Sequence, residues 1–163
     1  MPPSAPERPP LVSRAEELAR ELAVGSRCEA GVGAFLHLLA AQRGRSRVAA
    51  ADVGVVGVAW LVSALQPTVA FVAAERREGE RAALARLVAE DEQATVAGTA
   101  AALEREAPFD LVVDGSDGDV PVAALLAPGG TVVSFSPLET NPLLRAVAVD
   151  VSGTALSVAV RVR

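Results

Sequence analysis

The sequence predicts an α/β protein built on a single doubly wound, mostly parallel sheet that a C-terminal antiparallel hairpin closes. Short apolar runs alternate with amphipathic helical patterns along the chain, as expected for strands joined by crossover helices. The last two apolar runs instead alternate in hydrophobicity and flank Ser152-Gly153-Thr154, as the strands of a hairpin do. Because no internal repeat interrupts this order, residues 13–163 are expected to form one domain.

Two helices are expected before the first strand. Residues 1–12 are rich in proline and are predicted to form a disordered tail. Ser13 and Glu16 have the spacing of a capping box, so the first helix should begin at Ser13 and end near Gly25. The apolar residues of 29–43 recur at helical spacing and predict the second helix.

Strands and crossover helices then alternate. Continuous apolar runs are typical of parallel strands buried on both faces, and proline and glycine mark where elements end. The expected strands cover residues 47–53, 68–74, 94–97, 109–114 and 131–135, followed by hairpin strands 144–151 and 155–162. The expected crossover helices cover residues 58–65, 78–90, 99–106 and 119–126.

Composition excludes several classes of function. The 163 residues carry a net charge of −5 and few aromatic side chains, so a nucleic-acid partner is not expected. No stretch approaches the roughly 20 apolar residues of a membrane span, and the N-terminus lacks the layout of a signal peptide. We therefore expect no membrane contact and a cytoplasmic location. The chain has no lysine or tyrosine, so no side chain of either type is available as a base or a phosphate clamp.

Isolated reactive residues have structural interpretations. The single cysteine, Cys28, allows no intrachain disulfide and is expected to be a small buried hydrophobe. His37, on an apolar helical pattern, is expected to be partly buried, since a general base needs a partner carboxylate and an open cleft. Trp60 is expected to fill space between helix and sheet. Residues 114–119 resemble a Ca²⁺ loop only superficially and predict a solvated loop.

The first strand ends in a candidate cofactor turn. Asp52 is followed by Gly54 and Gly57, the layout of strand, tight turn and helix at which α/β proteins bind nucleotide-like cofactors. Three positions of this turn that should be small and flexible are valines instead: Val55, Val56 and Val58. Valine restricts φ and is expected to fill the space that a cofactor needs. A purely structural alternative is that Asp52 and Gly54 only shape the turn.

Several strings, in this order, resemble the class I S-adenosylmethionine-dependent methyltransferases, and most of all the bacterial O-methyltransferases of the catechol and caffeoyl-CoA type. The resemblance runs from about Arg14 to the C-terminus. It is carried by the leading helices and by EGERAALARLVAE, PFDLVVDGSD and LLAPGGTVV. It implies a Rossmann-like methyltransferase fold, with S-adenosylmethionine as the cofactor.

The resemblance places two carboxylates against the cofactor. The family's loop reads acid-x-Gly-x-Gly-x-Gly; Asp52 and Gly54 match its start, but the loop here is shorter. The family holds the cofactor ribose with an acid that ends strand two. Alignment through the following helix puts Arg76 at that position, and a small shift would bring Glu75 there instead. The alternative is that residues 74–81 are a solvated charge cluster at a helix start.

The adenine and metal positions depart from the family pattern. The family's adenine-contacting acid lies in Gly-Asp-Ala, whereas this chain has Gly98-Thr99-Ala100, in which Thr99 also suits a helix N-cap. Metal-dependent members bind a divalent ion through an acid after strand four and an Asp-Asn pair after strand five. Asp114 or Asp117 matches the first, but Phe135-Ser136 replaces the pair. No metal is therefore expected.

The resemblance leaves three functional hypotheses. The candidate cofactor-binding residues are Asp52, Gly54, Gly57, Glu75, Gly98, Thr99 and Asp114. The departures favour a degenerate O-methyltransferase-like protein that acts by binding or assembly, as a homo-oligomer or as a partner of an active relative. The first alternative is an active, metal-independent methyltransferase that acts on a small molecule. The second is another ligand or reaction in the same crevice. The sequence identifies no catalytic residue.

The segment on the substrate side is also short. The family usually has a long helix between strands five and six, where this chain has only residues 136–143. Either the substrate side of the sheet lies open, or another chain covers it.

Overall fold

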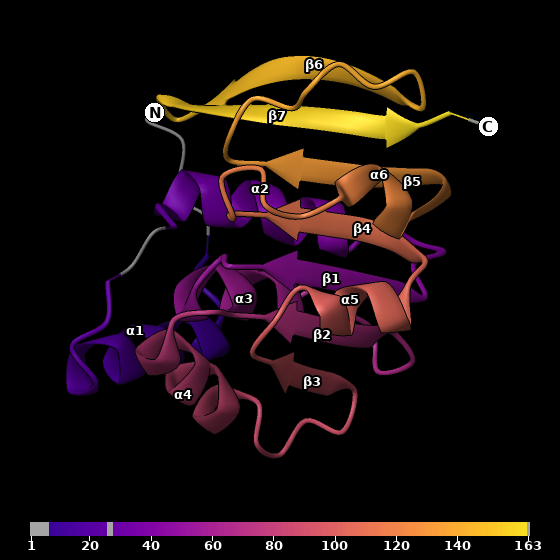
Figure 1. The fold of residues 1–163 in the computed structure, drawn as a ribbon. Coiled ribbons are helices and arrows are strands. Elements are labelled where there is room, and N and C mark those ends of the chain that lie inside the picture. Colours follow the sequence, from indigo (N-terminus) through magenta and orange to yellow (C-terminus); the bar gives the residue numbers. More distant parts are fainter. Residues whose placement is uncertain (1–6, 26–27, 163) are drawn as a thin grey trace.

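The computed structural model describes residues 7–25 and 28–162, which form a seven-stranded sheet with helices on both faces (Figure 1). The strand order is β3-β2-β1-β4-β5-β7-β6. The strands are β1 Arg47–Ala51, β2 Ala70–Ala74, β3 Ala94–Ala97, β4 Phe109–Asp114, β5 Leu126–Ser134, β6 Leu144–Val151 and β7 Thr154–Arg161. The helices are α1 Pro10–Glu21, α2 Ala30–Ala40, α3 Val55–Val62, α4 Glu78–Leu87, α5 Ala101–Glu106 and α6 Val122–Leu125.

The predicted doubly wound sheet is confirmed. Strands β1 to β5 pair in parallel, and β7 pairs antiparallel with both β5 and β6. The chain runs outward from β1 through β2 to β3 and then crosses to β4 on the other side of β1. The carboxyl ends of β1 and β4 therefore meet at a topological switch point, where open α/β sheets bind their ligands.

Buried apolar side chains form one layer on each face of the sheet. Helices α1 to α4 pack against one face around residues such as Leu36 and Val58, and α5 and α6 pack against the other around Leu103 and Leu125. Helices α5 and α6 lie in front of the sheet in Figure 1. Successive residues of each central strand contribute to opposite layers, which explains why these strands read as continuous apolar runs.

The first helix begins earlier than predicted. Helix α1 starts at Pro10, with Pro9 at the N-cap position and no side-chain cap, so the capping box at Ser13 is wrong. Proline suits the first helical position because its missing N–H has no partner to lose there. The predicted tail is therefore too long at its C-terminal end, where Val12 is fully buried; residues 1–6 lie outside the described part.

Two other boundaries differ in ways that shape the site. Helix α3 begins at Val55, directly after Gly54, and not at Val58 as predicted. Strand β5 begins at Leu126 and not at residue 131 as predicted, and its pairing with β4 shifts register between Phe109 and Leu111. Within the described residues, no helix is long and apolar enough to cross a membrane.

Candidate functional site

Three of the predicted carboxylates lie at one edge of the sheet. Asp52 follows β1, Glu75 follows β2, and Asp114 ends β4. The pairing aligns these ends, because Ala51 is opposite both Ala74 and Asp114. All three acids are buried, with exposed fractions of 6%, 0% and 1% respectively. A buried carboxylate is costly unless it is paired or hydrogen-bonded, so the partners of each acid decide what this edge can bind.

Arg76 takes both oxygens of Asp52. The Arg76 backbone N–H donates to Asp52 Oδ1 at 2.9 Å, and its Nε donates to Asp52 Oδ2 at 2.6 Å. The same guanidinium donates through Nη1 to Asp119 Oδ2 at 2.8 Å. These hydrogen bonds raise the pKa of Arg76 above its usual value. Arg76 thus bridges the end of β1 to the loop that follows β4, directly across the switch point.

Glu75 is paired by its own neighbour. Glu75 Oε1 accepts from the Arg77 backbone N–H at 3.2 Å and from Arg77 Nε at 2.8 Å, and Oε2 accepts from Arg77 Nη2 at 3.1 Å. The hydrogen bonds to Glu75 raise the pKa of Arg77. The residue that directly follows β2 is Glu75, and Arg76 comes one position later. Both carboxylate oxygens of Glu75 accept hydrogen bonds from Arg77.

Glu80 is a site residue that the sequence did not reveal. It lies on α4 and is 2% exposed, and its Oε2 accepts from the Val55 backbone N–H, the first of α3, at 3.0 Å. A carboxylate is favourable there because helix N-terminal N–H groups attract negative charge. The expectation that residues 74–81 are a solvated cluster is thus wrong for Glu75 and Glu80. The local sequence around Glu80 gives no sign of its burial, because its hydrogen-bond partner lies 25 positions away in the chain.

The remaining candidate residues have varied surroundings. Gly54, with φ at +86°, is the N-cap residue of α3, a conformation that glycine adopts readily. Gly57 lies inside α3, where a Cβ would come within 2.4 Å of Val53 Cγ1, so close packing explains it. Gly98, after β3, faces the Arg81 guanidinium, and Thr99 is exposed with no side-chain cap on α5.

The three valines after Gly54 do not fill the crevice. Val55, Val56 and Val58 are each at most 2% exposed and belong to the apolar layer beneath α1 and α2. The crevice at the switch point has a volume of about 310 Å³ and is lined by Asp52, Arg76, Arg77, Gly115 and Asp117. The cationic side chains that line this crevice are two arginines, Arg76 and Arg77.

Asp114 sits in a turn that is only partly solvated. Its Oδ1 accepts from the Ser116 backbone N–H at 2.8 Å and from Ser116 Oγ at 2.5 Å, and Ser116 is itself 1% exposed. Burial raises the pKa of Asp114, and the nearby charges of Asp52 and Asp117 act in the same direction. The predicted solvated loop is therefore wrong for Asp114 and Ser116.

The raised pKa of Asp114 predicts a pH-dependent stability effect. The pKa of Asp114 is higher in the folded protein than in the unfolded chain, so the protonated carboxyl favours the folded state. This contribution to stability is complete below about pH 4 and is lost as the pH rises through the folded-state pKa. Asp114→Asn keeps an oxygen to accept from Ser116 and removes the buried charge. We expect its Tm to exceed that of the wild type by about 3 °C at pH 8, with the difference shrinking towards pH 4.

Thermal unfolding followed by circular dichroism across this pH range checks the effect. Glu92→Gln is the matched control, because it removes one negative charge from an exposed position. A Tm difference for Asp114→Asn that did not depend on pH would show that the charge of Asp114 is not the cause.

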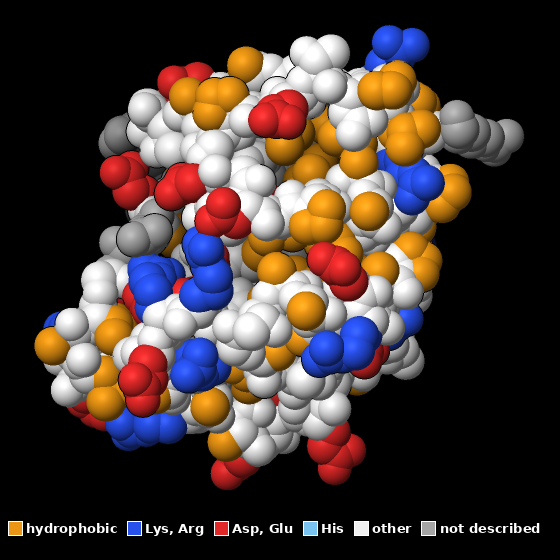
Figure 2. All heavy atoms as spheres, in the orientation of Figure 1, with side chains coloured by type: hydrophobic (Ala, Val, Ile, Leu, Met, Phe, Trp, Pro, Cys, Tyr) orange, Lys and Arg blue, Asp and Glu red, His pale blue; other side chains and the backbone are white. Residues whose placement is uncertain are grey.

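A larger cavity lies beside the crevice. It has a volume of about 900 Å³ and lies between the loop after β4, helix α6 and the segment 137–144. This segment contains no helix, in agreement with the expectation that the long helix of the resembled family is missing from this chain. Figure 2 shows hydrophobic side chains gathered over this region, with acidic side chains among them. Volumes of this size are typical of small-molecule sites.

The isolated reactive residues have the predicted structural roles. Cys28 is 7% exposed, and burial raises the pKa of its thiol to about 12, so it stays protonated at neutral pH. His37 is half-buried, and its Nδ1 lies 3.1 Å from both the Trp60 carbonyl oxygen and Ser63 Oγ. Neither residue lines the crevice or the larger cavity.

Comparison with known proteins supports the fold. No protein-family model and no curated protein matches the chain. Among solved structures, the O-methyltransferase TomG from Streptomyces achromogenes in complex with SAM has a TM-score of 0.77 at 21% identity, covering 96% of this chain and 92% of that one. Cofactor-bound Rv0187 from MTB has a TM-score of 0.81 at 17% identity, covering 97% and 92%.

The O-methyltransferase from Bacillus cereus in complex with SAH is similar to the same extent. Its TM-score is 0.77 at 16% identity, and the match covers 98% of this chain and 93% of that one. The likeness spans nearly the whole of each chain, and the fold predicted from the sequence is confirmed. The protein therefore has the fold of the class I S-adenosylmethionine-dependent O-methyltransferases.

Proposed function

We propose that this protein is a degenerate O-methyltransferase-like protein that does not transfer methyl groups and acts by binding or assembly. The observation that carries the proposal is the Arg76 bridge, which joins Asp52 to Asp119 across the switch point. A cofactor in this crevice would have to displace a guanidinium that two carboxylates hold.

The other groups suited to S-adenosylmethionine are engaged as well. Arg77 occupies both oxygens of Glu75, and Glu80 occupies the first N–H of α3. The crevice, at about 310 Å³, is at the lower end of the range for small-molecule sites. As arranged here, these residues do not fit S-adenosylmethionine, and we assign them no step in methyl transfer.

Calorimetric titration with S-adenosylmethionine and S-adenosylhomocysteine tests the proposal. For wild-type protein we expect no heat of binding up to about 1 mM ligand. Arg76→Ser frees the Asp52 carboxylate, and we expect it to bind S-adenosylhomocysteine at least about tenfold more tightly than the wild type does. Arg86→Ser is the control, because Arg86 forms an exposed ion pair with Glu21 away from the crevice.

Micromolar binding by the wild type would refute the degenerate interpretation. If Arg76→Ser bound no more tightly than the wild type, the Arg76 bridge would not be what closes the crevice.

The second candidate is an active, metal-independent methyltransferase on a small molecule. The observation that favours it is the gathering of Asp52, Glu75 and Asp114 at one edge, in a fold whose solved examples include complexes with SAM and SAH. Transfer of a methyl group depends mainly on positioning, and a preformed edge of this kind supplies it. Wild-type binding in the titration, followed by methyl transfer from labelled cofactor, would establish this function.

Assembly with a second chain is part of the proposal. Strand β6 lies at the edge of the sheet, and Val147 and Val160 on the terminal hairpin are 61% and 42% exposed. Uncovered strand edges with apolar side chains are typical contact surfaces. A homo- or hetero-oligomer in the cytoplasm is thus our working interpretation, which sedimentation velocity would test.

A further inference from the structure

The cavity of about 900 Å³ has charged residues of mostly one sign. Its apolar wall comes from α6, from the segment before β6 and from the first residue of β6, through side chains such as Val122, Leu138 and Leu144. Its charged lining residues are four acids and one arginine: Asp114, Asp117, Asp119, Glu139 and Arg161. A ligand that fills this space must therefore be largely apolar and is favoured if it carries positive charge.

One carboxylate oxygen in the wall has no partner. Asp114 is 1% exposed, and both of its hydrogen bonds from Ser116 go to Oδ1. Oδ2 accepts no hydrogen bond from the residues that the structure describes. A free oxygen of a buried carboxylate at a cavity wall gains most from a charged donor, since charge-assisted hydrogen bonds are the strongest kind available.

The other acids in the cavity wall either accept hydrogen bonds within the chain or are exposed to solvent. Asp119 is paired with Arg76, and Asp117 Oδ1 accepts from Ser136 Oγ at 3.0 Å. Glu139 is exposed at the rim. No three acidic, histidine or cysteine side chains among the described residues are placed to hold one metal ion. The geometry thus favours an organic cation over a metal.

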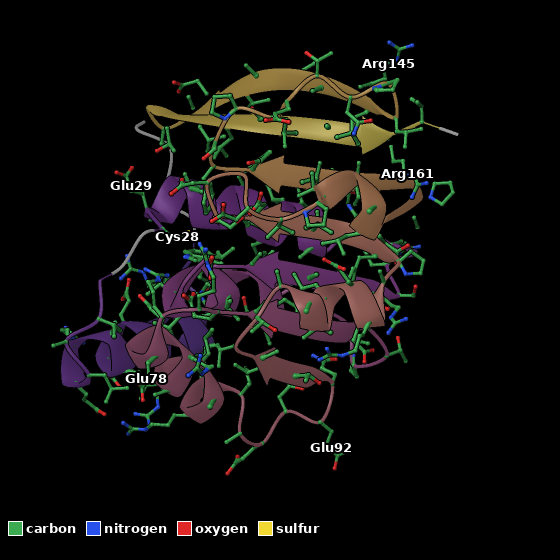
Figure 3. All side chains as sticks on the ribbon, viewed as in Figure 1. Cys28, Glu29, Glu78, Glu92, Arg145 and Arg161 are labelled. Carbon is green, nitrogen blue, oxygen red and sulfur yellow. The ribbon has the colours of Figure 1, made fainter. Side chains whose placement is uncertain are left out.

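The arginine in the wall lies at the opposite end of the cavity. Asp114 is opposite Ser134, which is opposite Ser157, and Arg161 follows four residues later along β7. That separation along the strand is about 13 Å. Figure 3 shows Arg161 beside α6, away from the edge where the acids gather. Positive charge on the ligand is therefore favoured at the Asp114 end, with the apolar wall between the two ends.

We propose that this cavity binds a small organic amine, with its ammonium group at Asp114 and its apolar body along α6 and residues 137–144. The proposal deepens the proposed function, because it names a ligand class for a protein that acts by binding. The ammonium donates to Asp114 Oδ2, and the neighbouring acids stabilise its charge.

Three probes with the same chain and different head groups test the proposal: hexylammonium, hexanol and hexanoate. In calorimetric titrations of the full chain at neutral pH, we expect hexylammonium to bind at least about tenfold more tightly than hexanol, and hexanoate least tightly. Asp114→Asn should weaken hexylammonium binding by about tenfold or more and leave hexanol binding unchanged.

Two further variants locate the site. Ala124 lines the cavity and is exposed, so Ala124→Phe should reduce the binding of both hexylammonium and hexanol by occupying their space. Glu92→Gln, beside β3 at the far end of the sheet (Figure 3), should change neither. If Asp114→Asn fails to fold, Asp117→Asn serves in its place, since Asp117 lines the same cavity.

Several results would overturn the proposal. For the wild type, these results are equal binding of the three probes or no binding of any. For the variants, they are undiminished hexylammonium binding by Asp114→Asn or Asp117→Asn, and undiminished binding of hexylammonium and hexanol by Ala124→Phe. The outcome is separate from the cofactor titration, because S-adenosylmethionine tests the crevice under Arg76 and the hexyl probes test the cavity. Either proposal can therefore fail while the other stands.

Discussion

Arg77→Ala is expected to lower the Tm by about 5–10 °C, the shift that roughly 2–3 kcal/mol produces in a domain of this size. The physical reason is that Glu75 is fully buried and Arg77 donates to both of its oxygens. Removing one partner of a buried pair costs about 3–5 kcal/mol, and the smaller value here allows for the one-third exposure of the Arg77 side chain, which admits water. Thermal and urea unfolding measure the effect.

A matched exposed pair and a compensating variant make this prediction specific. Arg86→Ala removes an arginine from an ion pair in which both side chains are about half exposed, so it should cost at most about 1 kcal/mol. Adding Glu75→Gln to Arg77→Ala removes the stranded charge and should recover most of the loss. Equal losses for Arg77→Ala and Arg86→Ala would show that Glu75 does not depend on its guanidinium.

Gly33→Ala is expected to destabilise the protein by about 1–3 kcal/mol, although alanine is the better helix former. Gly33 lies in α2 where the helix crosses α3, and a Cβ there would come within 2.2 Å of Trp60 Nε1. Trp60 is 3% exposed and packed on all sides, so the indole ring cannot move aside without disturbing the core. Denaturant unfolding of the variant measures the cost.

The control for this prediction is Gly25→Ala, because a Cβ at Gly25 would meet nothing within 4 Å. It should change the free energy of unfolding by less than about 0.5 kcal/mol. In the Gly33→Ala background, Trp60→Phe should cost less than it does in the wild type, since the smaller ring relieves the overlap. Additive losses would contradict the proposed contact between α2 and α3.

Much of the fold could be predicted because its signals are local. Strands β3 and β4 have the predicted bounds, since buried parallel strands form continuous apolar runs that proline, glycine and charge interrupt. Helix starts were less predictable. Pro10 begins α1 and Val55 begins α3 without a side-chain cap, and both starts are set by packing against the sheet and the neighbouring helices.

The candidate site also could be predicted only in part from the sequence. Asp52, Glu75 and Asp114 could be placed at the sheet edge because each ends an apolar run, and parallel strands end together. Their partners could not be predicted. Arg76 and Glu80 lie in a charged stretch that, by composition, suits solvent, and only the folded chain brings them to residues 24 or 25 positions away.

The sequence by itself determined the doubly wound sheet, the terminal hairpin and the position of three acids at one edge, because hydrophobic periodicity and strand ends are properties of adjacent residues. Only the tertiary structure decided that Arg76 bridges the switch point, that Glu80 contacts the first N–H of α3, and that a large cavity opens beside them. Ion pairs and cavities arise between distant segments, and their energies depend on burial, which no local pattern specifies.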